Sequence, residues 1–284
     1  MADGNYLDSE ILGTLRPFLE LYPTLKQLTG QIAQFKIVID ANMALADLLH
    51  KHAHAGLRQT AIEEAVKSSA IELHAPTWLD KEMIGSAIPQ VSRKKGIPES
   101  ALLTLWAEYK EQIIWDDAFS APAPDDTTDG DSKDVPYVAL QRSVSAAAIL
   151  SRDKDIDDLG GQRVDLEFVL SVRTYARATS YVVGIRVGGV FVTWISVGML
   201  AQIVKLVVSS ISRLPDGVKF ALMAVVAFVV IHPQSRERIL ALFKDLGVLL
   251  ADAWPEIEAL IELATTKQIE AEAALANSEK LLSP

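Results

Sequence analysis

The sequence KIVIDAN at residues 36–42 decides the fold of this chain. Ile37, Val38 and Ile39 are consecutive β-branched residues, which predicts a short buried β-strand. Asp40 follows at the point where this strand ends. Ligands of open α/β sheets bind outside the carboxyl ends of parallel strands. We therefore expect an α/β protein whose active site begins at Asp40 and is completed by acids from other segments.

The composition limits the classes of function that this chain can have. Its 284 residues suffice for about two domains, and 50% of them are hydrophobic. The absence of cysteine excludes a disulfide framework and a thiolate metal site. The net charge of −10 argues against broad electrostatic binding of nucleic acid, so such binding depends on a local basic patch or on metal ions. The acidic start of the chain is not typical of a signal peptide.

Short apolar runs alternate with helical patterns up to about residue 160. Residues 1–35 are predicted to form an N-terminal helical segment, and residues 36–161 a domain with a parallel sheet. Further strands are expected at Ala70–Leu73 and Ala146–Leu150. Helices are expected over residues 43–67, 78–88, 98–114 and 135–143. Two prolines set boundaries in this prediction, because Pro76 suits the opening of a helix and Pro89 its end.

Acidic residues follow the predicted strands or lie on the helices between them. If the strands that precede Asp40 and Asp153 are parallel neighbours, these carboxylates face each other at one edge of the sheet. Crowded carboxylates raise one another's pKa unless cations neutralise them. Oxygen ligands without histidine or cysteine select Mg²⁺ or Mn²⁺, which polarise phosphoryl oxygens and activate water. The set that points to phosphodiester hydrolysis consists of Asp40, Glu82, Asp134, Asp153 and Asp155.

Ordinary structural roles remain open for these residues. Acids at strand ends also serve as helix caps and turn residues. The basic cluster Arg93, Lys94 and Lys95 is either a solvated turn or a contact to the phosphate backbone of a substrate.

Four segments together resemble the PIN-domain nucleases in their order and approximate spacing. The family's strand ending in D-x-N matches Asp40 and Asn42, and its helical acid after an Ala-Pro turn matches Glu82. Its D-x-P-[FY]-x-A-L helix start matches Asp134, and its [ST]-x-D-x-D after a strand matches residues 151–155. These matches lie in the runs KIVIDAN, APTWLDKEM, DSKDVPYVAL and AAILSRDKDI.

The resemblance implies a Rossmann-like parallel sheet with an acidic pocket for Mg²⁺ or Mn²⁺. It also implies a ribonuclease that prefers single strands, often the toxin of a toxin–antitoxin pair. Asp40, Glu82, Asp134 and Asp153 are then the catalytic metal ligands, with Asp155 as a weaker fifth. Asn42 and Ser151 orient these carboxylates. Candidate partners are RNA, an antitoxin and a second copy of the chain. The alternative is a PIN-like binding or regulatory module without nuclease activity.

The segment after residue 161 changes in character. Residues 162–233 are predicted to be helical and contain two apolar runs, Val187–Val204 and Val218–Ile231, joined by a Pro-Asp-Gly turn. At 1.5 Å per residue the first run measures about 27 Å, close to the hydrocarbon thickness of a bilayer. This hairpin, residues 187–231, predicts either a membrane anchor or a buried helical pair. Residues 234–284 predict amphipathic helices. A membrane anchor leaves the nuclease domain in the cytoplasm, at the inner membrane if the source is bacterial.

Overall fold

The computed structural model describes residues 9–21, 32–120, 132–186 and 258–283. The chain divides into two compact units, Met1–Val183 with Lys267–Pro284, and Gly184–Thr266. The described residues of the second unit, 184–186 and 258–266, are helical. The first unit carries the sheet and all the predicted acids.

The first unit is built on a sheet of five parallel strands in the order β3-β2-β1-β4-β5. This confirms the predicted α/β fold with a parallel sheet. The order reverses direction between β1 and β4, and such a reversal is where open α/β sheets bind their ligands. The strands are β1 Phe35–Ile39, β2 Ile71–Pro76, β3 Ile114–Asp116, β4 Ala148–Leu150 and β5 Arg163–Val164.

The register of β1 and β4 brings two distant segments to the same edge of the sheet. Ile39 pairs with Leu150, and the N–H of Asp40 donates to the carbonyl oxygen of Leu150 at 3.2 Å. The residues of both strands that form this pairing, Ile37–Ile39 and Ala148–Leu150, are fully buried, and their apolar side chains fix the register. Asp40 and Ser151 therefore leave the sheet side by side.

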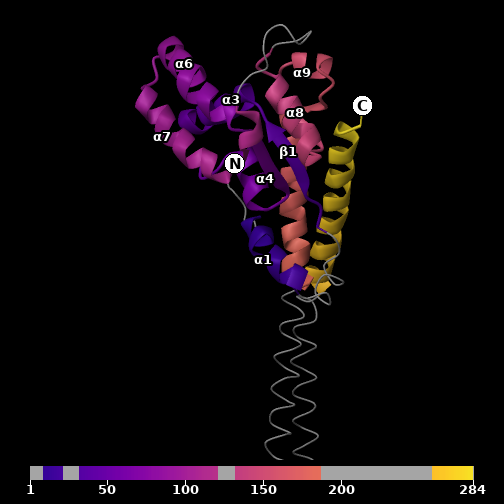
Figure 1. Ribbon diagram of the computed structural model, residues 1–284. Helices are drawn as coiled ribbons and strands as arrows, with labels where there is room; N and C mark the ends of the chain where they lie inside the picture. Colours follow the sequence, from indigo (N-terminus) through magenta and orange to yellow (C-terminus); the bar gives the residue numbers. More distant parts are fainter. Residues whose placement is uncertain (1–8, 22–31, 121–131, 187–257, 284) are drawn as a thin grey trace, which may run out of the picture. The chain divides into compact units, whose positions relative to one another are not determined.

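Helices on both sides of the sheet cover its apolar faces. α3 (Ala41–Ala53) and α4 (Ala61–Lys67) connect β1 to β2, and α8 (Val135–Val144) precedes β4. In Figure 1, α3 and α4 lie on one side of β1 and α8 on the other, as right-handed crossovers require. α8 contacts β1, β2 and β4, while α1 (Glu10–Leu21) contacts α4. A capping box between Thr60 and Glu63 starts α4 and divides the single helix predicted over residues 43–67.

Two predictions based on proline are wrong. Pro76 ends strand β2 and pairs with Asp116, so the next helix, α5 (Trp78–Glu82), begins only after it. Pro89 does not end the following helix, because a π-helical turn over Met83–Ala87 leads into α6 (Ile88–Lys95) and places Pro89 in the first turn of α6. A proline costs little there, since its missing N–H is not needed for an intrahelical hydrogen bond.

The helix predicted over residues 98–114 is also too long. α7 runs over Glu99–Tyr109, a 3₁₀ turn covers Lys110–Gln112, and β3 begins at Ile114. Another 3₁₀ turn, Asp117–Phe119, follows β3. Neither β3 nor β5 was predicted as a strand. Helix 166–186 starts after β5.

The C-terminal helix, residues 258–281, packs with its part from residue 267 onward against helix 166–186 within the first unit. Tyr175 and Ala178 form a buried cluster with Ala271 and Ala274. The hydroxyl of Ser171 donates to the carbonyl oxygen of Ala274 at 2.9 Å. Figure 1 shows these two helices side by side.

The predicted apolar hairpin, residues 187–231, lies outside the described residues, as do residues 121–131 of the acidic loop. Among the described residues, no helix is both long enough and apolar enough to cross a bilayer.

Candidate metal centre

Asp40 is held in a fixed orientation at the end of β1. It caps the N-terminus of α3, and its Oδ1 accepts a hydrogen bond from the N–H of Met43 at 2.7 Å. Its Oδ2 accepts a hydrogen bond from the hydroxyl of Ser151, the first residue after β4. That hydroxyl in turn accepts the N–H of Asp153 at 2.9 Å. Ser151 thus connects the acids that follow the two central strands.

Three carboxylates come together next to this connection. One oxygen each of Asp134, Asp153 and Asp155 lies within 4.8 Å of the others, and the first two side chains are partly buried while Asp155 is exposed. Asp134 is the residue before α8, and Asp155 is the first residue of the short helix α9 (Asp155–Asp158). The N–H of Asp155 donates to Oδ1 of Asp153 at 3.2 Å, which fixes the turn between them. Three acids from two segments therefore form one compact group.

Glu82 approaches the same region from the last residue of α5. Its Oε2 accepts a hydrogen bond from the hydroxyl of Tyr137 at 2.9 Å. Tyr137 is 1% exposed and lies in the first turns of α8. Burial, followed by the negative charge of Glu82, raises the pKa of the Tyr137 phenol well above 10, so it remains a donor at neutral pH. The charges of Asp40 and Asp134 act in the same direction.

The electrostatics of Asp40 are those of a buried acid among other acids. Burial raises the pKa of its carboxyl to about 6, against the lowering effect of the hydrogen bonds from Ser151 and Met43. The charges of Asp153 and Glu82 contribute smaller upward effects to this same pKa. A divalent cation at this place relieves both the repulsion and the loss of hydration.

The chemistry of the donors fits Mg²⁺ or Mn²⁺. Asp134, Asp153 and Asp155 supply carboxylate oxygens from a partly exposed position, which leaves room for the waters that Mg²⁺ retains. Asp40 and Glu82 border this group but are not part of the compact trio. Asp155, which the resemblance implies as a weaker fifth ligand, is a member of the trio.

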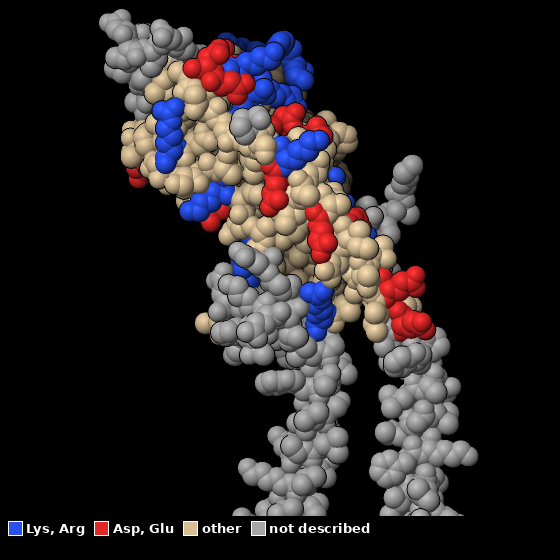
Figure 2. Space-filling view, turned by 90° about the vertical axis from the view of Figure 1, so that its right-hand side faces the viewer, with Lys and Arg blue, Asp and Glu red and all other residues tan. Residues whose placement is uncertain are grey.

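Other predicted residues lie in different surroundings. Asn42 is exposed in the first turn of α3. Arg93, Lys94 and Lys95 form the exposed last turn of α6, and of these three Lys95 lines a cavity of about 610 Å³. Figure 2 shows basic side chains gathered beside acidic ones at the upper end of the face it draws, so the negative net charge does not make this surface uniformly acidic.

Tyr137 is the residue that the sequence analysis missed. It belongs to the D-x-P-[FY] pattern that identified Asp134, but the pattern alone does not show that its hydroxyl binds Glu82. Its signal was a large polar aromatic residue three positions after an acid at a helix start.

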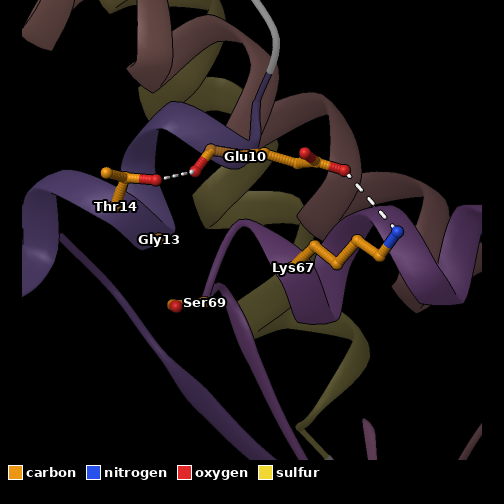
Figure 3. Close-up of a pocket in the computed structure, with 5 residues that line it drawn as sticks. All are labelled: Glu10, Gly13, Thr14, Lys67 and Ser69. Atoms are coloured by element: carbon orange, nitrogen blue, oxygen red, sulfur yellow. Dashed lines mark hydrogen bonds and ion pairs between the residues drawn. The ribbon is translucent and has the colours of Figure 1, made fainter.

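A second hollow, of about 340 Å³, lies at the opposite edge of the sheet (Figure 3). Ser69, one of its lining residues, precedes β2, so this hollow opens at the amino ends of the strands. Glu10 and Lys67 form an ion pair of 3.7 Å across it. This hollow is therefore separate from the acids, which lie at the carboxyl ends of the strands.

Comparisons with protein-family models, with curated proteins and with solved structures found no match for this chain.

Proposed function

We propose that this protein is a divalent-metal-dependent nuclease that hydrolyses phosphodiester bonds in single-stranded RNA. The observation that carries the proposal is the trio Asp134, Asp153 and Asp155, whose carboxylate oxygens lie within 4.8 Å of one another at the carboxyl edge of the sheet. The position at the reversal of strand order, between β1 and β4, supports it. The resemblance of the four acidic segments to PIN-domain nucleases supplies the choice of RNA.

The trio would hold Mg²⁺ or Mn²⁺, which would neutralise charge on a phosphodiester and activate water. The remaining residues of the site prepare this arrangement. Ser151 fixes Asp40 relative to Asp153, and Tyr137 fixes the carboxylate of Glu82. Both buried donors reduce the freedom of acids that otherwise repel each other, so the site is organised before substrate binds.

The proposal extends to the place where the enzyme works. The apolar runs of residues 187–231 support attachment of the cytoplasmic nuclease domain to a membrane. Recovery of the full-length chain in the membrane fraction, released by detergent but not by high salt, tests this part separately.

The nuclease proposal is tested by cleavage of an end-labelled single-stranded RNA in Mn²⁺, in Mg²⁺ and in EDTA. Wild type should cleave with either metal, and Asp153→Asn should lose at least about a hundredfold in rate, because it removes one carboxylate from the trio. Asp158→Asn is the matched control, since Asp158 is an exposed acid of the same helix α9 that lies outside the trio. Equal rates for wild type and Asp153→Asn, or no cleavage by wild type in Mn²⁺, would refute the proposal.

A further inference from the structure

A cavity of about 610 Å³ adjoins the acidic site and has no role in the chemistry described so far. Its walls come from α3, from the start of α4 with the segment before it, and from helix 166–186. Its volume falls in the range of sites that hold small organic ligands. Apolar side chains form much of the lining, among them Leu57, Ile62, Leu166 and Leu170.

Two residues of the lining carry buried polar atoms that the protein leaves unsatisfied. Within the described part of the chain, neither Oε1 of Gln59 nor Nε of Arg173 has a hydrogen-bond partner. Most buried polar atoms in folded proteins are paired, so such atoms require an explanation. The first is an acceptor and the second a donor. A ligand that offers both a donor and an acceptor satisfies the two atoms together.

One part of the cavity lining also carries basic side chains. Lys95, Arg152 and Arg173 contribute to it, against one carboxylate in the lining, that of Asp47, which accepts a hydrogen bond from Thr60. Both Lys95 and Arg152 are exposed, as groups that contact a phosphate backbone usually are. An anionic ligand with an apolar, hydrogen-bonding body therefore fits this cavity.

Two residues of the cavity lining lie next to members of the acidic site. Met43 lines it, and the N–H of Met43 donates to Asp40. Arg152 lines it as well and lies between Ser151 and Asp153 in the sequence. A polymer that crosses the acids therefore reaches the cavity with its neighbouring unit.

We propose that the cavity binds one nucleotide of the RNA, adjacent to the phosphodiester at the acidic site. Its base lies among the apolar side chains and pairs with Gln59 and Arg173, while Lys95 and Arg152 contact the backbone. Unpaired bases expose edges with both donors and acceptors, whereas duplex RNA hides them. The inference rests on the proposed nuclease function for the identity of the ligand, and it makes the cavity the reason for a preference for single strands.

The test measures binding rather than cleavage. The full-length chain is titrated in EDTA with a fluorescent single-stranded RNA and with an abasic ribose-phosphate oligomer of the same length. Gln59→Leu removes the acceptor, and Leu170→Trp fills the cavity from a position that is 38% exposed and hence tolerant of a larger side chain. Each variant should weaken binding of the RNA about tenfold, with little change for the abasic oligomer.

Lys95→Ala probes the backbone contact. It should weaken binding of both oligomers and reduce the slope of log affinity against log salt concentration by about 0.7. Lys67→Ala removes the same charge at the opposite edge of the sheet and should leave both affinities unchanged. Thermal unfolding of every variant establishes that it is folded.

The outcomes separate this inference from the proposed function. Unchanged RNA binding by both Gln59→Leu and Leu170→Trp overturns the inference, even if wild type cleaves RNA. An equal loss for the RNA and the abasic oligomer overturns it too, since it assigns the contact to phosphate alone. Selective loss of RNA binding in an enzyme that fails to cleave supports the cavity as a nucleotide site and refutes only the nuclease proposal.

Discussion

The hydroxyl of Ser151 donates a hydrogen bond to the carboxylate of Asp40, across the boundary between the two central strands of the sheet. Ser151 is fully buried, and Asp40 is 3% exposed. The same hydroxyl accepts the N–H of Asp153. One small side chain therefore sets the spacing between an acid that follows β1 and an acid that follows β4.

Replacement of this hydroxyl should weaken the metal centre without unfolding the protein. We expect Ser151→Ala to lower Mn²⁺ affinity and RNA cleavage by about tenfold to a hundredfold, the usual effect of losing a group that orients a ligand. Calorimetry with Mn²⁺ and the cleavage rate at saturating metal measure the two effects. Ser143→Ala, at an exposed serine of α8, is the control for the same chemical change. Wild-type metal affinity in Ser151→Ala would show that the hydrogen bond has no orienting role.

Tyr137 offers a second test of how the acids are oriented. Tyr137→Phe removes only the hydroxyl that donates to Glu82 at 2.9 Å, and it retains the buried ring. We expect the cleavage rate to fall about tenfold, while the free energy of unfolding falls by about 2 kcal/mol, typical of one hydrogen bond to a charged group. Cleavage kinetics and urea unfolding of the same preparation separate the two quantities. A loss of stability without a loss of rate would assign Tyr137 to the core alone.

The sequence predicted those segments in which a local run of apolar residues is enough to identify a buried strand. β1 and β4 are apolar runs followed by acids, so both the strands and the residues at their ends could be read directly. β5 has only two residues, which is too short for a pattern to appear, and Ile114 of β3 continues the apolar pattern of the helix predicted over residues 98–114. The helix that contains Pro89 was missed because no residue pattern distinguishes the π-helical turn that precedes it from the end of a helix.

The sequence identified the acidic residues of the site, but it did not predict which of them lie together. The sequence ranked Asp155 below Asp40 and Glu82, but the turn that joins Asp153 to Asp155 brings Asp155 into the trio. The cavity was not predicted at all. Gln59 precedes α4 and Arg173 lies on helix 166–186, so no local pattern connects them.

Arg177 connects helix 166–186 to the sheet domain through a bidentate ion pair. Its Nε and Nη2 donate to the two carboxylate oxygens of Glu64, each at 2.6 Å, and Glu64 is 5% exposed. Arg177→Met should therefore lower the free energy of unfolding by about 2 kcal/mol, because it leaves a buried carboxylate without its cation. The effect stays below that of a fully buried pair, since the arginine side chain is 38% exposed.

Urea unfolding measures this difference, and the double variant Arg177→Met with Glu64→Gln is the control. It removes the charge that the single variant leaves behind, so it should recover part of the lost stability. A single variant as stable as wild type would contradict the prediction.

The buried carboxyl of Asp40 makes stability depend on pH. Its pKa of about 6 in the folded protein exceeds the ordinary value of 3.8, so the folded state keeps its proton at pH values where the unfolded state has lost it. The contribution of Asp40 to stability therefore falls as pH rises from about 3.8 to about 6, and the loss is complete above that range. The difference between the two pKa values corresponds to about 3 kcal/mol.

In EDTA, Asp40→Asn should thus be more stable than wild type above about pH 6, and this gain should disappear toward pH 4. Urea unfolding at a series of pH values measures it, with Asp158→Asn as the same substitution at an exposed acid. A variant less stable than wild type at pH 7 in EDTA would mean that the hydrogen bonds from Ser151 and Met43 outweigh the burial of the charge.

A variant of Asp155 tests whether this residue is a main metal ligand, as the geometry indicates, or a weaker fifth ligand, as the sequence predicts. If its position in the trio reflects coordination, Asp155→Asn should weaken Mn²⁺ binding about as much as Asp153→Asn, by at least about tenfold. Saturating Mn²⁺ should also stabilise wild type by about 3 kcal/mol at a hundred times its dissociation constant, and the two variants by less at the same concentration. Calorimetry and thermal unfolding with and without Mn²⁺ measure both effects, with Asp158→Asn as the neighbour that keeps wild-type affinity. A normal affinity in Asp155→Asn would instead restore the order read from the sequence, with Asp40 or Glu82 as the third ligand beside Asp134 and Asp153.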